Sequence, residues 1–185
     1  MNGVPDKKGR LGDGNVAFKK ATDPAILNNL SKGPQPWIAI LSCSDSRVVP
    51  ERVFNLSMGD AFVVRVAGNT ASDSQVLGSL EYAVEHLHVR DLMVLGHTSC
   101  GAVKVAMEGK ETGNLWAVVR DIERAKMKVP TENDTDPDAI AEMNVKLQVR
   151  ILEDNSFVIR GAMEKGQLAL YGAMYDIKTG TVRFI

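Results

Sequence analysis

The order of apolar runs along the chain constrains its fold more than any other feature. Short runs at Trp37–Leu41, Ala61–Ala67 and Asp91–Leu95 have the length and boundaries of buried strands, and residues 167–175 predict a further strand. Segments with helical periodicity separate these runs. Because strands that alternate with helices indicate βαβ units, we expect an α/β fold with a mostly parallel central β-sheet flanked by helices.

Four helices are predicted around these strands: one capped by Ser72 or Asp73 and running to Leu87, one beginning after Cys100, one near 114–127, and one over 139–152. A surface loop is expected between the last two. The turn Lys178–Gly180 precedes Val182–Phe184, which predicts a C-terminal hairpin strand.

The N-terminal region reads as a helical arm. Residues 11–30 carry spaced apolar side chains, and the stretch Gly33–Pro36 ends the helical pattern. A length of 185 residues with 44% hydrophobic content is typical of one domain with a substantial core. We therefore expect a single domain over residues 1–185, with 1–36 as the arm and 37–185 as the α/β core.

Charge and hydropathy exclude several classes of protein. The net charge is −1, so no basic excess indicates a nucleic-acid partner. Met1–Arg10 lacks the apolar region of a secretory signal, and no apolar run is long enough for a membrane span. We expect a cytoplasmic protein without nucleic-acid or membrane partners.

The two cysteines, Cys43 and Cys100, are too few for the disulfide framework of a small secreted protein. They can be buried apolar residues, one disulfide, or metal ligands. Cys43 follows the first predicted strand, and His97 and Cys100 follow the third. Ligands of parallel sheets lie outside the carboxyl ends of the strands, so the three side chains meet if these strands are neighbours.

Cys43, His97 and Cys100 form a ligand set that suits zinc. Zinc favours thiolate and imidazole, and its catalytic sites keep three protein ligands and one open position. Asp45 and Arg47 follow Cys43 closely, and a carboxylate held by arginine stays ionised in a fixed orientation. The alternatives are a polar core histidine with two buried cysteines, and an ordinary ion pair in a loop.

The segments Cys43–Val48 and Gly96–Val103 resemble the two signatures of the β-class carbonic anhydrases, in the expected order and separation. Between Glu108 and Asn144 no residues match the motifs of this family. Other segments with the same resemblance are Gly14–Asn15, Gly59–Arg65, Ala67–Asn69, Ser79–Val84, Asn144–Gln148 and Gly172–Gly180. The resemblance therefore extends over most of the chain.

This resemblance implies one Zn²⁺ per chain, held by Cys43, His97 and Cys100, with Asp45 and Arg47 as a catalytic dyad. The implied activity is reversible hydration of CO2 to bicarbonate and a proton by zinc-bound hydroxide that the dyad orients. Zinc lowers the pKa of bound water to about 7, a value known from carbonic anhydrases themselves. The resemblance also implies a second state, in which Asp45 binds the metal and activity rises with pH.

The resemblance further implies that Phe62 and Tyr82 line the substrate pocket, where Val66 would complete a wall suited to apolar CO2. Core packing is their alternative role. Gly101 follows the last ligand and is expected to lend a backbone amide. Many plant-type members carry a glutamine nine positions before the first cysteine, and here Gln35 lies one residue later, so we expect Gln35 in the pocket.

Members of the family form dimers or larger even-numbered assemblies, so the resemblance implies a homodimer or higher homo-oligomer. The apolar side chains of residues 11–30 would pack on a neighbouring copy, or alternatively on their own sheet. His86 and His88 are candidates for proton relay, with helix-surface residues as the alternative.

Three rival functions use the same residues. The first keeps the fold and hydrolyses carbonyl sulfide or carbon disulfide. The second is a structural zinc module, although such sites usually have four protein ligands. The third is a redox protein with a Cys43–Cys100 disulfide, in which His97 has no function.

Overall fold

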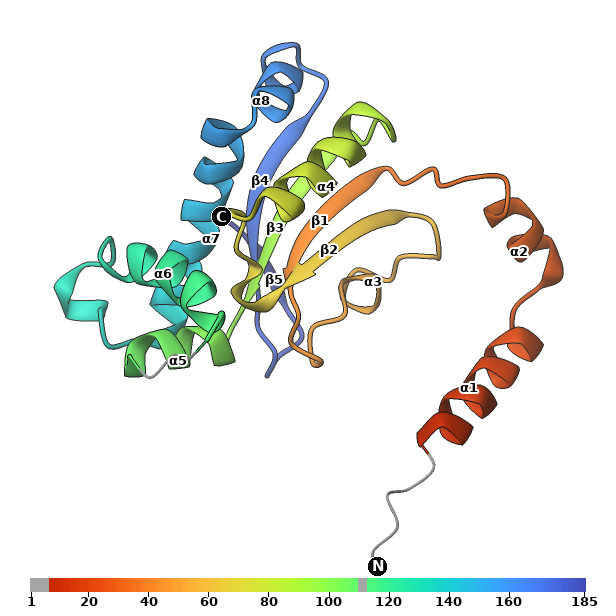
Figure 1. Ribbon diagram of the computed structural model, residues 1–185, viewed down its shortest axis with the longest axis horizontal. Coiled ribbons are helices and arrows are strands. Elements are labelled where there is room, and N and C mark those ends of the chain that lie inside the picture. Colours follow the sequence, from red (N-terminus) through yellow and green to blue (C-terminus); the bar gives the residue numbers. More distant parts are fainter. Residues whose placement is uncertain (1–6, 110–112) are drawn as a thin grey trace, which may run out of the picture. The chain divides into compact units, whose positions relative to one another are not determined.

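The computed structural model describes residues 7–109 and 113–185 (Figure 1). It divides the chain into two compact units, and the boundary between them in the sequence falls between Pro34 and Gln35. The beginning of the predicted arm, residues 1–6, and residues 110–112 of the polar segment lie outside the described residues. The assignment of the whole chain to a single domain stays a prediction.

The first unit holds two helices, α1 (Lys7–Ala21) and α2 (Pro24–Leu30). The predicted arm is thus interrupted, because Pro24 lacks the N–H that a continuing helix needs and instead occupies the first turn of α2. Asp23 caps α2, since its Oδ1 accepts the N–H of Ala25 at 2.8 Å. None of the described side chains of α1 and α2 is buried.

Five strands form one sheet within the described part of the second unit, in the order β2-β1-β3-β4-β5. Their bounds are β1 Ile38–Cys43, β2 Ala61–Val66, β3 Asp91–His97, β4 Ala169–Tyr175 and β5 Val182–Phe184. The first four are parallel, and β5 returns antiparallel to β4. The predicted parallel sheet and its hairpin are confirmed. β1 and β3 are neighbours, which is the condition under which the three candidate ligands meet.

The helices of this unit are α3 Pro50–Val53, α4 Ser74–Glu85, α5 Gly101–Glu108, α6 Leu115–Lys126, α7 Pro137–Asn155 and α8 Phe157–Glu164. The four expected helices correspond to α4–α7, and Asp73 rather than Ser72 caps α4. The sequence prediction missed α3 and α8. Ser156 begins α8, because its side chain accepts the N–H of Ile159 at 3.1 Å.

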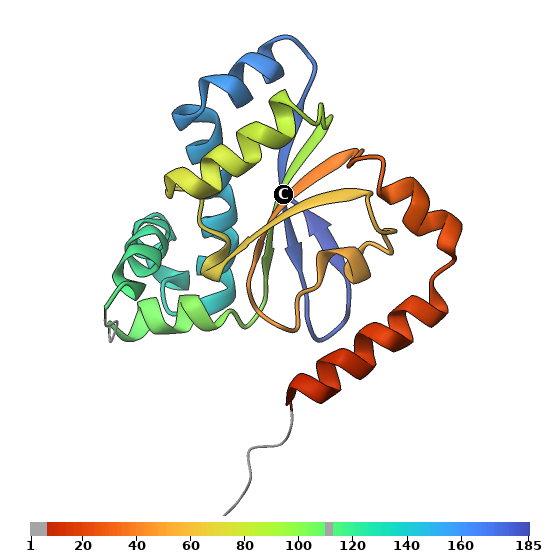
Figure 2. The same ribbon diagram turned by 45° about the vertical axis from the view of Figure 1, so that its right-hand side comes forward.

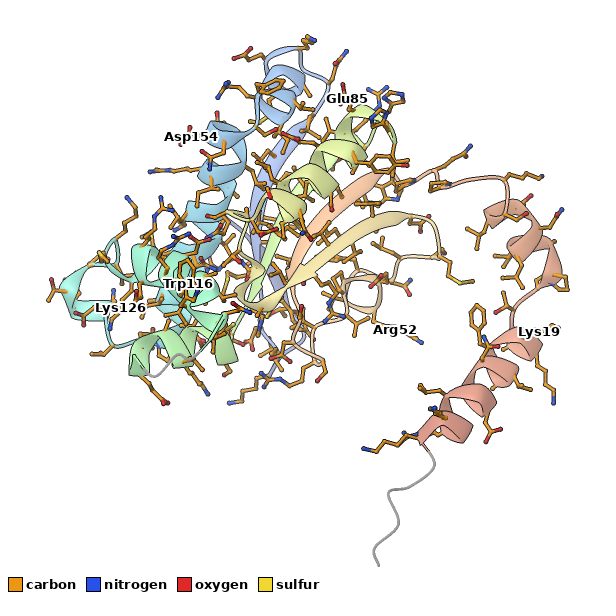
Figure 3. The ribbon with its side chains drawn as sticks, viewed as in Figure 1. Lys19, Arg52, Glu85, Trp116, Lys126 and Asp154 are labelled. Carbon is orange, nitrogen blue, oxygen red and sulfur yellow. The ribbon has the colours of Figure 1, made fainter. Side chains whose placement is uncertain are left out.

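Helices α4–α8 gather on one face of the sheet, as the two views of the ribbon show (Figures 1 and 2). Side chains alternate along a strand, so Leu41 of β1 packs with these helices while Ile40 joins a smaller cluster on the opposite face. Burial on both faces explains the continuous apolar run of β1. Charged side chains such as Glu85 and Asp154 project from the outer sides of the helices (Figure 3).

Helix α7 lies close to the sheet because two strands present glycine beneath it. The side chain of Val145 fits over Gly96 of β3 and Gly172 of β4. A Cβ on Gly96 would overlap Val145, and one on Gly172 would lie 2.6 Å from Val145 Cγ1. The two glycines therefore determine how near the whole helix approaches.

Glu142 joins α7 to β5 at the surface. Its carboxylate pairs with Lys146 Nζ at 2.7 Å and with Arg183 Nη2 at 2.5 Å. The two cations, Lys146 foremost, lower the pKa of Glu142.

Among the described residues, no helix has both the length and the apolar character to cross a membrane.

Candidate metal centre

The three predicted ligands meet at the carboxyl ends of β1 and β3. Cys43 is the last residue of β1 and His97 is the last residue of β3, while Cys100 immediately precedes α5. One ligand atom of each, the two sulfurs and a ring nitrogen, lies within 4.8 Å of the others. All three side chains are buried. The structure thus brings together the constellation that the sequence predicted.

The ring of His97 is oriented for binding a cation. Its Nδ1 lies 2.9 Å from the carbonyl oxygen of Thr98, and because a carbonyl only accepts, Nδ1 carries the hydrogen. The opposite nitrogen, Nε2, is buried and has no hydrogen-bond partner among the described residues. A buried lone pair without a partner is costly, and metal-ligating histidines usually donate their other ring N–H in this way.

The two cysteines stabilise a thiolate between them. The thiol of Cys100 and, to a smaller extent, His97 hold the pKa of Cys43 well below its usual range despite the opposing effect of burial. The same contact with Cys43 raises the pKa of Cys100. Two sulfurs that compete for one negative charge favour a divalent cation, which accommodates both as thiolates. This donor set, two sulfurs and one imidazole nitrogen, fits zinc.

Beyond the bond of the His97 ring to Thr98, four hydrogen bonds join the turn between His97 and Cys100 to other segments of the chain. Within it, Ser99 has a φ of +56°, a left-handed conformation that brings Cys100 back beside His97. The Thr98 N–H donates to Tyr175 O at 3.0 Å, and Thr98 Oγ1 accepts the N–H of Ile177 at 3.1 Å.

The other two bonds clamp Ser99 itself. Its N–H donates to Asp138 Oδ1 at 2.7 Å, and its carbonyl accepts from Arg47 Nη2 at 3.2 Å. The sequence prediction gave no role to Asp138. Its position in the first turn of α7 carried no signal, because only the fold places that turn against the ligands.

Asp45 and Arg47 form the predicted bidentate pair. Arg47 Nε donates to Asp45 Oδ1 at 3.0 Å, and Arg47 Nη2 donates to Oδ2 at 2.7 Å. The Asp45 side chain is 15% exposed and that of Arg47 50%. The guanidinium holds the pKa of Asp45 well below its usual range, so the carboxylate remains ionised and oriented.

Arg65 is a second cation at this loop that the sequence prediction left without a role. Its guanidinium donates to the carbonyl oxygens of Cys43, Asp45 and Val48, at 3.1, 2.6 and 2.6 Å. Arg65 therefore braces the end of β1, which carries the first ligand, and the following loop, which carries the dyad. The available signal was its position as the one charged residue in the apolar run Ala61–Val66.

Of the predicted substrate residues, Val66 and Gly101 lie beside the ligands. Val66 pairs with Cys43 across β2 and β1, and Gly101 follows Cys100 as the first residue of α5. Both positions are compatible with their predicted roles.

Phe62, Tyr82 and Gln35 lie elsewhere in the same chain. Phe62 pairs with Ala39 and lies four residues before Val66. It is therefore roughly 13 Å from Val66, toward the amino end of β2. The ring of Tyr82 lies 6.0 Å from that of Phe62, and Gln35 precedes the amino end of β1. Within one chain the structure does not bring these three side chains to the ligands, and their contact with substrate stays a prediction.

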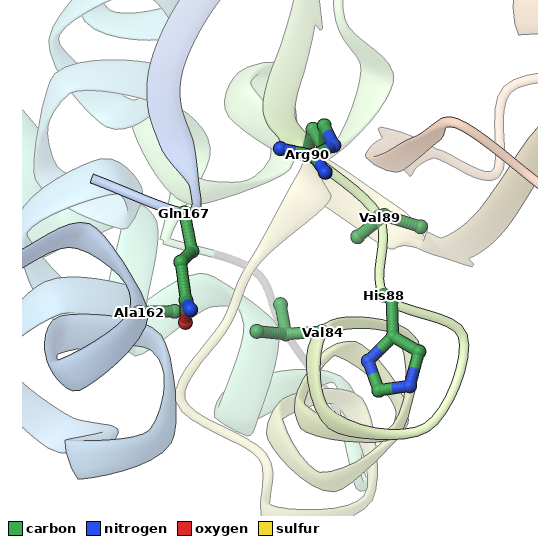
Figure 4. Close-up of a pocket in the computed structure, with 6 residues that line it drawn as sticks. All are labelled: Val84, His88, Val89, Arg90, Ala162 and Gln167. Atoms are coloured by element: carbon green, nitrogen blue, oxygen red, sulfur yellow. The ribbon is translucent and has the colours of Figure 1, made fainter. Parts of the chain in front are cut away.

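His88 lines a surface pocket of about 300 Å³ at the opposite end of β3 from His97 (Figure 4). Arg90 and Gln167, which precede β3 and β4, also line it. His86 is in the same region, at the C-terminal end of α4. A proton relay through either histidine within the same chain would have to cross about the length of the strand, roughly 20 Å.

Comparison with known proteins supports one family. The carbonic anhydrase family profile matches residues 38–182. Carbonic anhydrase 2 of Mycobacterium tuberculosis (strain CDC 1551 / Oshkosh) is 40% identical over 156 residues, covering 82% of this chain and 75% of the relative.

Solved structures give the same result. A tetrameric β-carbonic anhydrase of Sordaria macrospora superimposes with a TM-score of 0.88 at 27% identity, covering 98% of each chain. The Coccomyxa β-carbonic anhydrase in complex with acetazolamide has a TM-score of 0.85 at 28% identity, covering 98% of this chain and 87% of the other.

Proposed function

The chain belongs to the β-class carbonic anhydrases, which hydrate CO2 to bicarbonate, and we propose that it uses one zinc ion held by Cys43, His97 and Cys100. The observation that carries this proposal is the convergence of the two sulfurs and one ring nitrogen of His97 within 4.8 Å, on a ring whose Nε2 is buried without a hydrogen-bond partner among the described residues. A bound zinc ion would lower the pKa of a coordinated water to about 7, the value known from carbonic anhydrases.

Asp45 orients the attacking nucleophile by accepting its hydrogen bond, and Arg47 keeps Asp45 ionised and in place. The two-point contact with Arg47 supports this role, because a carboxylate held at both oxygens has little freedom to rotate. The same contact favours a resting state in which Asp45 remains with Arg47 rather than on the metal. Val66 contributes apolar surface suited to CO2, and the Gly101 amide is available to the product anion.

We also propose a homo-oligomer with an even number of copies, supported by the tetrameric relatives from Sordaria macrospora. In such an assembly Phe62 and Tyr82 would line the site of a neighbouring copy, since they lie apart from the ligands of their own chain. Mixed oligomers of Asp45→Asn and Tyr82→Ala chains test this arrangement. Activity above that of either variant alone supports sites built from two copies, and activity no higher than that of the variants contradicts it.

Two rival functions receive less support from the site. A structural zinc module needs a fourth protein ligand, and the carboxylate of Asp45, two residues after Cys43, is engaged with Arg47. A Cys43–Cys100 disulfide would leave the buried Nε2 of His97 unexplained. The remaining rival, hydrolysis of carbonyl sulfide or carbon disulfide, shares the fold. Comparing the turnover of CO2 with that of carbon disulfide distinguishes it from CO2 hydration.

Stopped-flow CO2 hydration, with and without a zinc chelator, tests the proposed function. We expect one zinc per chain, loss of activity on chelation, and recovery on addition of zinc. Cys100→Ser should lose zinc, whereas Ser44→Ala, at the residue after Cys43, should keep it. Full activity in protein without bound metal would contradict the proposal.

A further inference from the structure

The turn after β2 places a backbone amide on one of the candidate ligands. Gly68 lies in the 3₁₀ turn Ala67–Asn69, and its N–H donates to Cys43 Sγ at 3.3 Å. Its φ is +67°, and a Cβ there would lie 2.8 Å from Ile122 Cδ1. Both the left-handed backbone and the lack of space require glycine at this position.

Two amide side chains of α7 hold this turn from the other side. Asn144 Nδ2 donates to the carbonyl oxygen of Gly68 at 2.8 Å. Gln148 lies one helical turn later, and its Nε2 donates to Asn144 Oδ1 at 2.8 Å. Gln148 Oε1 accepts the N–H of Ala71 at 2.8 Å, which closes a ring of bonds around residues 68–71.

This amide relay, Asn144 and Gln148, has only one consistent orientation. Turning either amide over would set a donor against a donor or an acceptor against an acceptor. Asn144 is 1% exposed, Gln148 is 0% exposed, and Ala71 is likewise buried, so bulk water has no access to replace a lost partner. Such fully satisfied buried networks make a local structure rigid.

The relay is connected to Cys43 through one residue. The N–H and the carbonyl of Gly68 belong to successive peptide units joined at its Cα. Anchoring the carbonyl on Asn144, in a turn that is also held at Ala71, therefore restricts the direction in which the N–H points. Hydrogen bonds to a ligating sulfur change its donation to the metal, and outer partners of ligands typically affect metal affinity by roughly 10- to 100-fold.

We propose that Asn144 and Gln148 are positioning residues of the metal centre, which hold the Gly68 N–H on the Cys43 sulfur and thereby tune the bond between that sulfur and the metal. The proposal rests on the proposed function in one respect, namely that Cys43 ligates zinc. The new element is that two side chains of α7 contribute to the metal affinity without binding the metal or the substrate.

Gln148→Met and Asn144→Leu test the relay, because both keep the side-chain size and remove the hydrogen bonds. We expect zinc affinity, measured by competition with a chelator, to fall roughly 10-fold or more in each. The sulfur-to-cobalt charge-transfer band of the Co²⁺-loaded protein should shift as well. Leu147→Met is the matched control, since it introduces methionine at the adjacent buried position outside the relay.

A measurement on the unchanged chain tests the inference independently of any variant. With ¹¹³Cd and ¹⁵N labelling, scalar coupling between the metal and the Gly68 amide proton reports the N–H···S bond directly. We expect this coupling in the wild type and in Leu147→Met, and its reduction in Gln148→Met.

Absence of the coupling in the cadmium-loaded wild type would overturn the inference. So would equal zinc affinity and equal cobalt spectra in Gln148→Met and Leu147→Met. Wild-type protein that binds neither zinc nor cadmium through sulfur would instead overturn the proposed function, and this inference with it.

Discussion

Replacing Gly96 with alanine tests how closely α7 must approach the sheet. The new methyl group would overlap Val145 and would lie 2.8 Å from Met174 Sδ, so neighbours on two elements have to move. Overpacking of this kind typically costs about 1–3 kcal/mol. Gly96→Ala should therefore lower the free energy of unfolding by that amount, or the melting temperature by roughly 2–12 °C for a domain of this size.

A double-mutant cycle isolates the contact with Val145. Val145→Ala alone removes two buried methyl groups and should cost about 2 kcal/mol. In the double variant the alanine at 96 occupies part of the space that Val145 leaves. We expect the cost of the double variant to fall below the sum of the single costs by at least about 1 kcal/mol.

Urea unfolding followed by circular dichroism is the assay, with every variant saturated with zinc. Gly78→Ala is the control, because Gly78 lies within α4 with no neighbouring atom within 4 Å of an added Cβ, and it should be neutral or stabilising by up to about 1 kcal/mol. Costs that add within about 0.5 kcal/mol, or a Gly96→Ala variant as stable as Gly78→Ala, would refute the packing argument.

Three further predictions concern charged groups. Asp45→Asn should keep one zinc per chain but lose at least about 100-fold in stopped-flow CO2 hydration, and unchanged turnover would remove Asp45 from the mechanism. Arg65→Met should cost about 1–3 kcal/mol in urea unfolding through its three lost carbonyl contacts, whereas the exposed Arg52→Met should stay within about 0.5 kcal/mol; equal stabilities would contradict the bracing role. Because its cationic partners lower the pKa of Glu142, the stability it contributes is present above its unfolded pKa of about 4.3 and is lost as the pH falls below that value. The difference in urea midpoint between wild type and Glu142→Gln should thus shrink from pH 7 to pH 3, and a difference that grows on acidification would show the opposite linkage.

The strands and the ligand cluster could be predicted because the signals for both are local. β1 and β3 are continuous apolar runs, and the ligands stand at their ends, where a parallel sheet gathers functional groups. α3 was missed because four residues are too few for a periodic pattern to be distinguished. α8 was missed because only Ser156 separates it from α7, and no proline or glycine marks a boundary there.

The supporting residues of the site could not be predicted in the same way. Asp138 and Gln148 each bond to a backbone group 39 or 77 positions away, and nothing in their immediate sequence tells which loop α7 will meet. For Phe62 a prediction was made, but it is not met within one chain. The family resemblance predicts that its ring lines the substrate pocket, whereas the register of β2 places the ring several residues from the ligands of its own chain.

The register of β1 and β3 has a consequence for the handling of the protein. Cys43 and His97 are carried by strands whose ladder bonds and packed faces belong to the core of the sheet. The separation of the two side chains is therefore set by the spacing of adjacent strands, about 4.8 Å, and does not depend on a bound ion. Stripping and reloading with a different divalent ion should leave the fold in place, in contrast to small zinc fingers, which collapse when their metal is withdrawn.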